Sequence, residues 1–251
     1  MKKILIICQA RYGSTRLPGK ALLKINNKPL LWYVIKRLEL VKHPCEIIIA
    51  TADSEENNSI IEFAKNQNLK YFAGNEEDVL DRYYQTAKKY DGEIIVRITS
   101  DCPLTDPQII DEALEIFLKG DYDYVCNVEP PTYPDGFDVE VFSFNALERV
   151  WKIEENKSIR EHVTFHIRLD MRKQQCNFKS FNFKNDYDYK DYPLTVDTKE
   201  VFELLSIIIK EFYNRWDKFD MKDVIQFIDK NPNLRDLNKM YERDEAVKKL
   251  K

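Results

Sequence analysis

Residues 3–20, KILIICQARYGSTRLPGK, decide the fold of this chain. An apolar run of strand length, residues 4–8, passes abruptly into a loop that carries the cations Arg11, Arg16 and Lys20. A continuous apolar run is typical of a strand that is buried on both faces of a parallel sheet. The loop after such a strand lies at the sheet edge where open α/β folds bind ligands. Its cations and free backbone amides favour a polyphosphate ligand.

This loop differs from two familiar phosphate-binding patterns. A P-loop needs Gly-x4-Gly-Lys-Ser/Thr, whereas Gly13 and Gly19 are six residues apart and Lys20 is followed by Ala21. The dinucleotide pattern Gly-x-Gly-x-x-Gly does not fit the loop either. P-loop kinases and Rossmann dehydrogenases are therefore disfavoured, which leaves a nucleoside triphosphate or sugar-nucleotide site of another design.

Strand and helix signals alternate through the first half of the chain. Further apolar runs predict strands at residues 46–51, 69–72, 93–98 and 122–125. Apolar stripes predict helices that include 30–38 and 60–64, and further helices are expected at 78–90 and 108–118. Ser54, Asp78 and Asp106 are the expected N-caps. Such alternation predicts a largely parallel sheet covered by helices, a Rossmann-like α/β fold.

The pattern changes over residues 127–190. Turn-forming pairs precede an alternating strand at 137–142, and a second alternating strand at 177–183 is rich in phenylalanine. Ser143 and Ser158 could cap two short helices. We expect this segment to be a β-rich insertion within a single domain that spans the whole chain.

Aromatic residues gather in the second strand of this insertion. Phe178, Phe181 and Phe183 stand among polar residues, so we expect the strand to be partly exposed. An exposed aromatic surface is typical of a subunit interface, although the same pattern also fits the edge of a core.

After the insertion the chain returns to the first pattern. A short strand is predicted at 194–197 and ends at Asp197, and a helix follows from Thr198. Asp220 is expected to cap another helix. The charged segment 234–251 is expected to be a peripheral helix or a frayed tail.

The composition is that of an ordinary globular protein. The 251 residues carry 39 basic and 43 acidic side chains, for a net charge of −4. This balance disfavours DNA and RNA as partners. No apolar run reaches the roughly 18 residues that a membrane-spanning helix needs, so we expect a cytoplasmic protein with no membrane partner.

The cysteines and histidines show no metal-binding or disulfide pattern. The five cysteines are scattered and lack Cys-x-x-Cys spacing. His162 and His166 have the spacing of one helix face, but no glutamate lies between them as in His-Glu-x-x-His. A zinc site is therefore disfavoured.

Six stretches in combination carry a resemblance to a known family. They are QARYGSTRLPGK at 9–20, GNEEDVLDRY at 74–83, RITSDCPL at 97–104, YPDGFDVE at 133–140, REHVT at 160–164 and LTVDT at 194–198. With them the chain resembles the cytidylyltransferases that activate sugar acids as CMP-sugars, and especially their spore-coat polysaccharide biosynthesis branch. The resemblance implies a three-layer nucleotide-diphospho-sugar transferase fold. It also implies transfer of CMP from CTP to a sugar acid or a phosphorylated sugar-like acceptor, with release of pyrophosphate, for surface glycan biosynthesis.

The resemblance also implies roles for particular residues. The nucleotide site that it implies comprises Ala10, Arg11, Gly13, Ser14, Arg16, Lys20, Asp78, Arg82, Thr99 and Ser100. The acceptor pocket that it implies comprises Asp135, Asp138, Glu140, Arg160, Glu161 and His162. In the family, the insertion makes a homodimer contact. A helix cap for Asp78, a turn for Asp135 and a solvated helix face for Arg160 are the alternatives from the residues alone.

Nucleotidyl transfer requires that the negative charge of the triphosphate is neutralised and that a divalent cation is bound. It also requires that the acceptor oxygen lies in line with the departing pyrophosphate. Arg11, Arg16 and Lys20 can neutralise the triphosphate, and Lys20 and Arg11 are the expected catalytic cations. Asp101 follows the strand at 93–98 and would point into the ligand crevice. Asp101 and Asp197 bind Mg²⁺ in the family that the chain resembles, and hard carboxylate oxygens suit this ion. An Asx turn for Asp101 and a helix N-cap for Asp197 are the simpler alternatives.

Two other functions are weighed against this one. A glycosyltransferase of the related fold usually has Asp-x-Asp after a strand, whereas Asp121-Tyr122-Asp123 precedes its predicted strand. A non-catalytic nucleotide sensor would keep Lys20 but would not need two aspartates. Since no serine or cysteine stands beside an evident general base, we expect the acceptor oxygen to attack the α-phosphorus directly.

Overall fold

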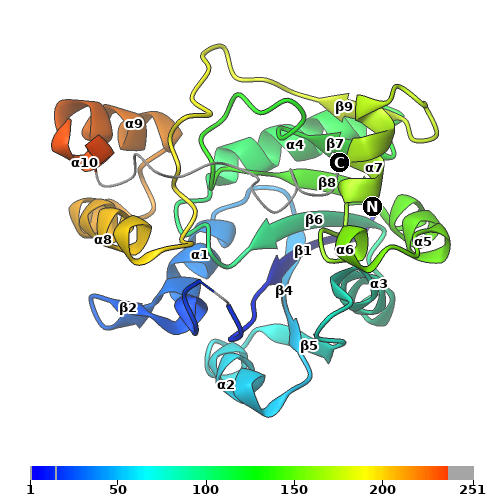
Figure 1. Ribbon diagram of the computed structural model, residues 1–251, viewed down its shortest axis with the longest axis horizontal. Helices are drawn as coiled ribbons and strands as arrows, with labels where there is room; N and C mark the ends of the chain where they lie inside the picture. The colour runs from blue at the N-terminus through cyan, green and yellow to red at the C-terminus, as the bar shows by residue number, and fades with distance from the viewer. Residues whose placement is uncertain (1, 15, 237–251) are drawn as a thin grey trace.

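The computed structural model describes residues 2–14 and 16–236 (Figure 1). Within these residues one seven-stranded sheet runs in the order β5-β4-β1-β6-β8-β7-β9. The strands are β1 Ile4–Gln9, β4 Cys45–Ala52, β5 Lys70–Gly74, β6 Ile94–Thr99, β7 Tyr124–Cys126, β8 Glu140–Ser143 and β9 Ser180–Asn182. β8 runs antiparallel to β6 and β7, and the other neighbouring pairs are parallel. A small hairpin of β2 Lys24–Ile25 and β3 Lys28–Pro29 lies outside this sheet.

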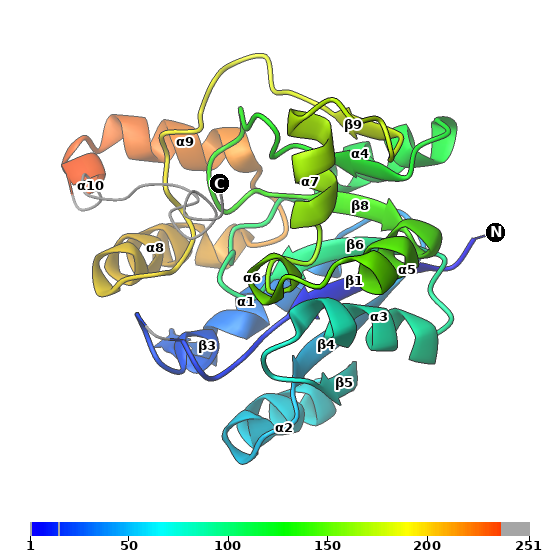
Figure 2. The same cartoon turned by 45° about the vertical axis from the view of Figure 1, so that its right-hand side comes forward.

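Helices cover both faces of the sheet. They are α1 Leu30–Leu38, α2 Asn58–Asn66, α3 Val79–Lys89, α4 Pro107–Lys119, α5 Phe144–Ile153, α6 Lys157–Arg160, α7 Phe165–Arg172, α8 Lys199–Phe212, α9 Met221–Lys230 and α10 Asn233–Asp236. In both views α8 and α9 lie on the opposite side of the sheet from α3 and α5 (Figure 1 and Figure 2). None of the described helices has the length and apolarity needed to cross a membrane.

The central strand shows why the fold has three layers. Ile4 and Ile6 of β1 pack in the cluster that includes α1, α4, α8 and α9. Leu5 and Ile7 pack in a second cluster with α3, α5 and α7. Successive side chains of a strand point to opposite faces, so a continuous apolar run is buried only when both faces are covered. The predicted three-layer α/β fold with a mostly parallel sheet is confirmed.

Most predicted helix starts are also confirmed, but two caps are wrong. Ser54 makes no capping bond, and its hydroxyl instead accepts from Asn57 Nδ2 over 2.8 Å. At α6 the cap is Asn156, whose Oδ1 accepts from the Ser158 amide over 3.0 Å. In both cases another polar side chain nearby makes the local contact, and Asx side chains reach the backbone two residues on as readily as serine does.

The segment at 127–190 joins the central sheet. It supplies β8 and β9 and the helices α5, α6 and α7 between them. Phe178 and Phe183 are buried, and Phe181 is 39% exposed, so the expected exposure holds for Phe181 alone of these three.

The predicted strand at 194–197 is wrong, because this stretch makes only isolated backbone contacts with its neighbours. The prediction for 234–251 lies mostly outside the described residues, and α10 covers its first part.

Candidate functional site

The carboxyl ends of two central strands bring the halves of the site together. β1 and β6 are parallel neighbours, with Gln9 aligned to Thr99. The amide of Ser100 donates to the Gln9 carbonyl over 2.9 Å, so the loops after both strands leave the sheet at the same edge. Open α/β sheets place their ligands at this edge.

The loop after β1 turns back at Gly19. The Gly19 amide donates to the Tyr12 carbonyl over 2.8 Å and closes the loop. Gly19 has a φ of 69°, and a Cβ there would lie 3.1 Å from the Tyr12 ring, so the turn favours glycine. Lys20 follows directly and begins a short 3-10 helix, Lys20–Leu22.

The Lys20 ammonium lies between the two predicted metal-binding aspartates. Its Nζ donates to Asp101 Oδ2 over 2.6 Å and to Asp197 Oδ1 over 2.8 Å. It also donates to the Val196 carbonyl over 2.8 Å. The side chain of Lys20 is 13% exposed. Three segments far apart in the sequence therefore converge on one cation through three oxygens.

Asp197 reaches this point without belonging to a strand among the described residues. The Val196 amide donates to the Asp101 carbonyl over 2.9 Å, which ties the two aspartate-bearing segments together. Thr195 Oγ1 donates to Asp135 Oδ1 over 2.8 Å, and Asp135 is itself buried. These bonds hold the segment beside the carboxyl end of β6.

Lys20 and Asp101 stabilise each other's charged form. Burial alone would raise the pKa of Asp101, but the charge of Lys20 and its hydrogen bond lower that pKa below its usual value. Burial alone would lower the pKa of Lys20, whereas Asp101 and Asp197 raise it above the usual range. At neutral pH the Lys20 ammonium therefore faces an ionised Asp101.

The three loop cations do not all meet the same partners. Arg16 Nη2 donates to Asp197 Oδ2 over 2.8 Å, and its side chain is 51% exposed. Arg11 Nη2 lies 3.5 Å from Glu161 Oε1, toward a neighbouring pocket. Lys20 and Arg16 thus both contact Asp197, whereas Arg11 contacts Glu161.

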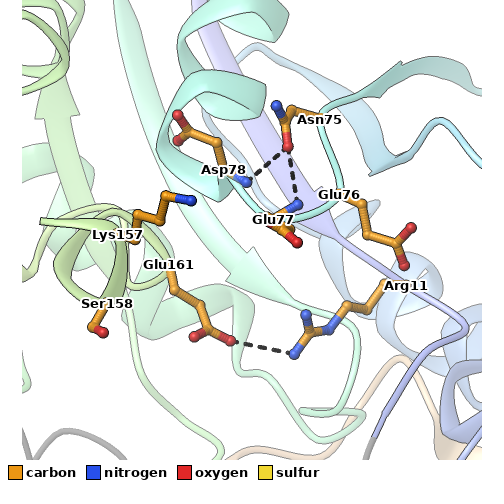
Figure 3. A pocket seen from close by; sticks show the side chains of 8 residues that line it. All are labelled: Arg11, Asn75, Glu76, Glu77, Asp78, Lys157, Ser158 and Glu161. Atoms are coloured by element: carbon orange, nitrogen blue, oxygen red, sulfur yellow. Dashed lines mark hydrogen bonds and ion pairs between the residues drawn. The ribbon is translucent and has the colours of Figure 1, made fainter. Parts of the chain in front are cut away.

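A pocket of about 440 Å³ lies beside Arg11 (Figure 3). Its lining consists of Arg11, Asn75, Glu76, Glu77, Asp78, Lys157, Ser158 and Glu161. Arg11, Asp78 and Glu161 were expected from the sequence, although for two different ligands. The sequence interpretation missed the other lining residues, whose signal was their position within or beside the stretches at 74–83 and 160–164. Figure 3 shows Arg11 and Glu161 pointing toward each other across the opening.

The loop between β5 and α3 shapes one wall of this pocket. Asn75 Oδ1 accepts from the amides of Glu77 and Asp78, each over 3.0 Å. Asp78 is also the N-cap of α3 and accepts from the Asp81 amide over 2.9 Å. Gly13 lies nearby, since a Cβ there would be 3.7 Å from Glu76 Oε1.

Other residues of the implied nucleotide site lie around the same edge. The buried Ala10 donates its amide to the Ala50 carbonyl over 3.0 Å. Thr99 Oγ1 lies 3.3 Å from Cys102 Sγ, and Ser100 is buried. Ser14 Oγ accepts from the Leu17 amide over 3.4 Å, so it helps to shape the loop.

Arg82 lies behind the pocket wall and does not line the pocket. Its side chain is buried, and Nη1 donates to the Asn75 carbonyl over 2.8 Å. Nε and Nη2 find no hydrogen-bond partner within the described part of the chain. Burial lowers the pKa of Arg82. The structure therefore places Arg82 as a support for Asn75.

The implied acceptor residues make different contacts. Arg160 Nη2 pairs with Asp78 Oδ2 over 2.8 Å and links α6 to the start of α3. Glu161 lines the pocket beside Arg11, whereas Asp135 accepts a hydrogen bond from Thr195, two residues before Asp197. Asp138 is partly buried, and the ring of His162 packs edge-on against Phe165.

Glu140 is buried in the core, although the resemblance implied a contact with an acceptor. Oε1 accepts from Tyr124 and from Thr164, and Oε2 accepts from Arg97 Nη1, each over 2.5 Å. Arg168 lies close enough to act on its charge. A strand position with alternating polarity looked accessible, but β8 lies inside the sheet between β6 and β7.

We expect Glu140→Gln to destabilise the protein in a pH-dependent way. Burial alone would raise the pKa of Glu140, but Arg97 and Arg168 lower it below 4.5. A lowered folded-state pKa contributes stability above the unfolded value, and this stability is lost as the pH falls toward the folded value. Urea unfolding at pH 7 should show a loss of about 3–5 kcal/mol, because the variant removes a buried carboxylate and leaves the Arg97 side chain, which is only 19% exposed, without its partner. The loss should shrink below pH 4.5.

Glu39→Gln is the matched control, since Glu39 is exposed and pairs with Lys36 at the surface. It should change the free energy of unfolding by less than about 1 kcal/mol at either pH. A Glu140→Gln effect of the same size at every pH would contradict the assigned charge of this carboxylate.

His166 of the histidine pair contacts a nearby glutamate. His166 Nδ1 lies 2.6 Å from Glu154 Oε2, which is a local ion pair or hydrogen bond. No group of three or more His, Cys, Asp or Glu side chains within residues 2–14 and 16–236 could hold a metal ion. A cation at Asp101 and Asp197 would therefore take further ligands from a bound molecule or from water.

Comparisons with known proteins relate the chain to one family. The sequence pattern of the family described as Cytidylyltransferase matches residues 5–246. The chain is similar to the spore coat polysaccharide biosynthesis protein SpsF of Bacillus subtilis, at 31% identity over 240 residues, which are 93% of this chain and 97% of the relative. It is 37% identical over 112 residues to a 3-deoxy-manno-octulosonate cytidylyltransferase of Geobacter metallireducens, covering 45% of this chain and 43% of that protein.

A solved structure shares nearly the whole fold. The structure of a cytidylyltransferase from Leptospira borgpetersenii superposes with a TM-score of 0.89 at 33% identity. The superposition covers 96% of this chain and 100% of that chain.

Proposed function

The chain belongs to the cytidylyltransferase family, and from this membership we propose that it transfers CMP from CTP to a sugar acid or a phosphorylated sugar-like acceptor. The observation that carries the proposal is the convergence of Lys20, Asp101 and Asp197 at the carboxyl edge of β1 and β6. Carboxylates that can hold a cation and a lysine that can reach phosphate are the parts that nucleotidyl transfer needs at one point.

The proposed cofactor is Mg²⁺, held by Asp101 and Asp197. Two carboxylates and the Val196 carbonyl already surround one cationic group, so the donors are hard oxygens of the kind that Mg²⁺ prefers. When bound, the ion would polarise a phosphoryl oxygen and offset the negative charge that develops during transfer.

The residues of the loop after β1 would bind and orient the triphosphate. Arg16 is exposed and has a planar guanidinium that can pair with two phosphate oxygens at once. Lys20 would act as a point charge on the phosphates. The acceptor oxygen would attack the α-phosphorus and form a new P–O bond, and an acceptor hydroxyl would lose its proton to water. The bond between the α-phosphorus and the oxygen that bridges it to the β-phosphorus would break and release pyrophosphate. The loop cations would stabilise the charge of the departing group.

The pocket beside Arg11 is the proposed place for the rest of the substrates. Arg11 and Lys157 face it from two walls and can bind a carboxylate or phosphate. Glu76, Glu77 and Glu161 can accept hydrogen bonds from hydroxyl groups of a sugar. The names of two relatives, one for spore coat polysaccharide and one for 3-deoxy-manno-octulosonate, support a surface-glycan acceptor.

A pyrophosphate-release screen tests the proposal. Each of the four nucleoside triphosphates is incubated with Mg²⁺ and a panel of sugar acids and sugar phosphates. We expect release with CTP and an acidic acceptor, together with a CMP-linked product by mass spectrometry. In a parallel assay with nucleotide sugars as donors, release of free nucleoside diphosphate would instead indicate a glycosyltransferase. Tight CTP binding without turnover for any acceptor would favour a nucleotide sensor.

We further propose that the segment at 127–190 makes a two-fold homodimer contact, as its aromatic strand suggests. Phe178 is buried and is therefore unsuitable as a probe. Phe181 is 39% exposed, and its ring centroid lies 5.4 Å from that of Tyr122. We expect the wild type to be a dimer by light scattering and Phe181→Asp to be a folded monomer, because a two-fold axis brings the new charge against its own copy.

Ile207→Asp is the control for this experiment. Ile207 is 41% exposed but lies on α8, outside the segment at 127–190. This variant should keep the mass of the wild type. A monomeric wild type at micromolar concentration would reject the interface, and a dimeric Phe181→Asp would place it elsewhere.

A further inference from the structure

The Lys20 ammonium uses all of its hydrogen-bonding capacity at one point. An ammonium has three donors and no acceptor. Asp101 Oδ2, Asp197 Oδ1 and the Val196 carbonyl accept from Nζ at 2.6 Å, 2.8 Å and 2.8 Å. The nitrogen thus fills the place where these oxygens converge, and the side chain that brings it there is largely buried.

A divalent cation needs the same oxygens. Metal–oxygen distances for Mg²⁺ are about 2.1 Å, so an ion bound to both carboxylates would lie within a few ångströms of Nζ. Two cations at such a separation in a partly buried site repel each other strongly. Lys20 and the divalent ion are therefore alternative occupants of one place.

The side chain of Lys20 can rotate away from these oxygens. Lys20 stands directly after the Gly19 turn, on a four-carbon side chain with several rotatable bonds. Triphosphate oxygens at the loop after β1 would supply new acceptors for its three donors. Arg16 differs from Lys20, because it pairs with the other carboxylate oxygen of Asp197, Oδ2, and is half exposed.

We propose that Lys20 is a built-in competitor for the cation site, so that the free protein holds divalent ions weakly and nucleotide phosphate must draw Lys20 away before the ion binds tightly. The inference rests on the proposed function of Asp101 and Asp197. Beyond that function, the inference couples binding of the divalent ion to binding of the nucleotide. Premature loading of the ion is then disfavoured, and the two ligands bind with positive cooperativity.

The test is titration of Mn²⁺ into the full chain without nucleotide, followed by electron paramagnetic resonance of the free ion. Lys20→Gln removes the competitor and should raise the affinity for Mn²⁺ by about tenfold or more. Arg16→Gln is the matched control, since it removes the same charge from the same Asp197. It should change the affinity by less than about threefold, because the Arg16 side chain is 51% exposed and an ion pair with an exposed partner is weak. Thermal unfolding checks that both variants fold.

Two results would overturn the proposal. Unchanged or weaker Mn²⁺ binding by Lys20→Gln would show that the ammonium does not block the ion. An equal rise in Arg16→Gln would show a general charge effect with no competition for place. The pyrophosphate-release screen with the wild type tests the proposed function independently of this competition. When Lys20→Gln does bind Mn²⁺ more tightly, adding Asp197→Asn shows where the ion lies. If the added change abolishes the tight binding, the ion lies at the aspartates. If tight binding persists, the cation site itself is misplaced and both proposals fall.

Discussion

Asp101→Asn and Asp197→Asn are each expected to lower the rate of pyrophosphate release from CTP by about a thousand-fold. Each change removes one of the two charges that hold the proposed Mg²⁺, and losing several kcal/mol of transition-state stabilisation corresponds to about three orders of magnitude in rate. Steady-state assays with CTP, Mg²⁺ and an acceptor from the screen measure the effect. The fold should persist, because each variant leaves Lys20 one carboxylate partner.

Asp91→Asn is the control for these variants. Asp91 is exposed at the opposite end of β6, and its φ of 52° is one that asparagine tolerates. It should keep nearly full activity. If Asp101→Asn or Asp197→Asn retained more than about a tenth of the wild-type rate at saturating Mg²⁺, the assignment of the cation to this pair would be untenable.

Arg37→Met is expected to destabilise the protein by about 3–5 kcal/mol, because it removes one partner of a buried charge cluster. The Arg37 side chain is 1% exposed, and it donates to the carbonyls of Thr105, Trp216 and Phe219 over 2.9 to 3.0 Å. Its charge also faces Asp106 at 3.9 Å. Burial lowers the pKa of Arg37 to about 10, so the guanidinium stays charged at neutral pH.

Lys36→Met on the same helix is the matched control. Lys36 is the neighbouring residue, and it pairs with Glu39 at the surface over 2.6 Å. Removing such a pair should cost less than about 1 kcal/mol. Urea unfolding at pH 7 compares the two variants. Equal losses would mean that Arg37 does not hold the region before α9 against α1 and the loop before α4.

The sequence predicted the strands of the first half and the loops that follow them. The apolar run at 4–8 became the central strand, and Lys20 and Asp101 lie after neighbouring strands as expected. Asp78, Asp106 and Ser143 cap their helices as predicted. Such features depend on side-chain spacing and capping within a few residues, so a single sequence carries them.

The sequence was least informative where a polar residue is buried by segments far away in the chain. Glu140 meets Arg97 and Thr164, which lie 43 and 24 residues away. Arg37 was passed over in the apolar stripe of α1, although Trp216 and Phe219 bury it from 179 and 182 residues away. No local spacing distinguishes such a charge from a solvated one, because its burial and its partners come from elements that meet only on folding.

Local pattern was enough for the three-layer fold and for identifying the charged loop, because alternating strands and helices with apolar faces pack in few ways. Long-range folding was needed for the site itself. The parallel pairing of β1 with β6 brings Lys20 to Asp101, and the backbone bond from Val196 to Asp101 brings Asp197 to the same point. The predicted strand at 194–197 was wrong, yet Asp197 is in position. Hydrogen bonds between distant segments, and not the secondary structure of Asp197, place its carboxylate.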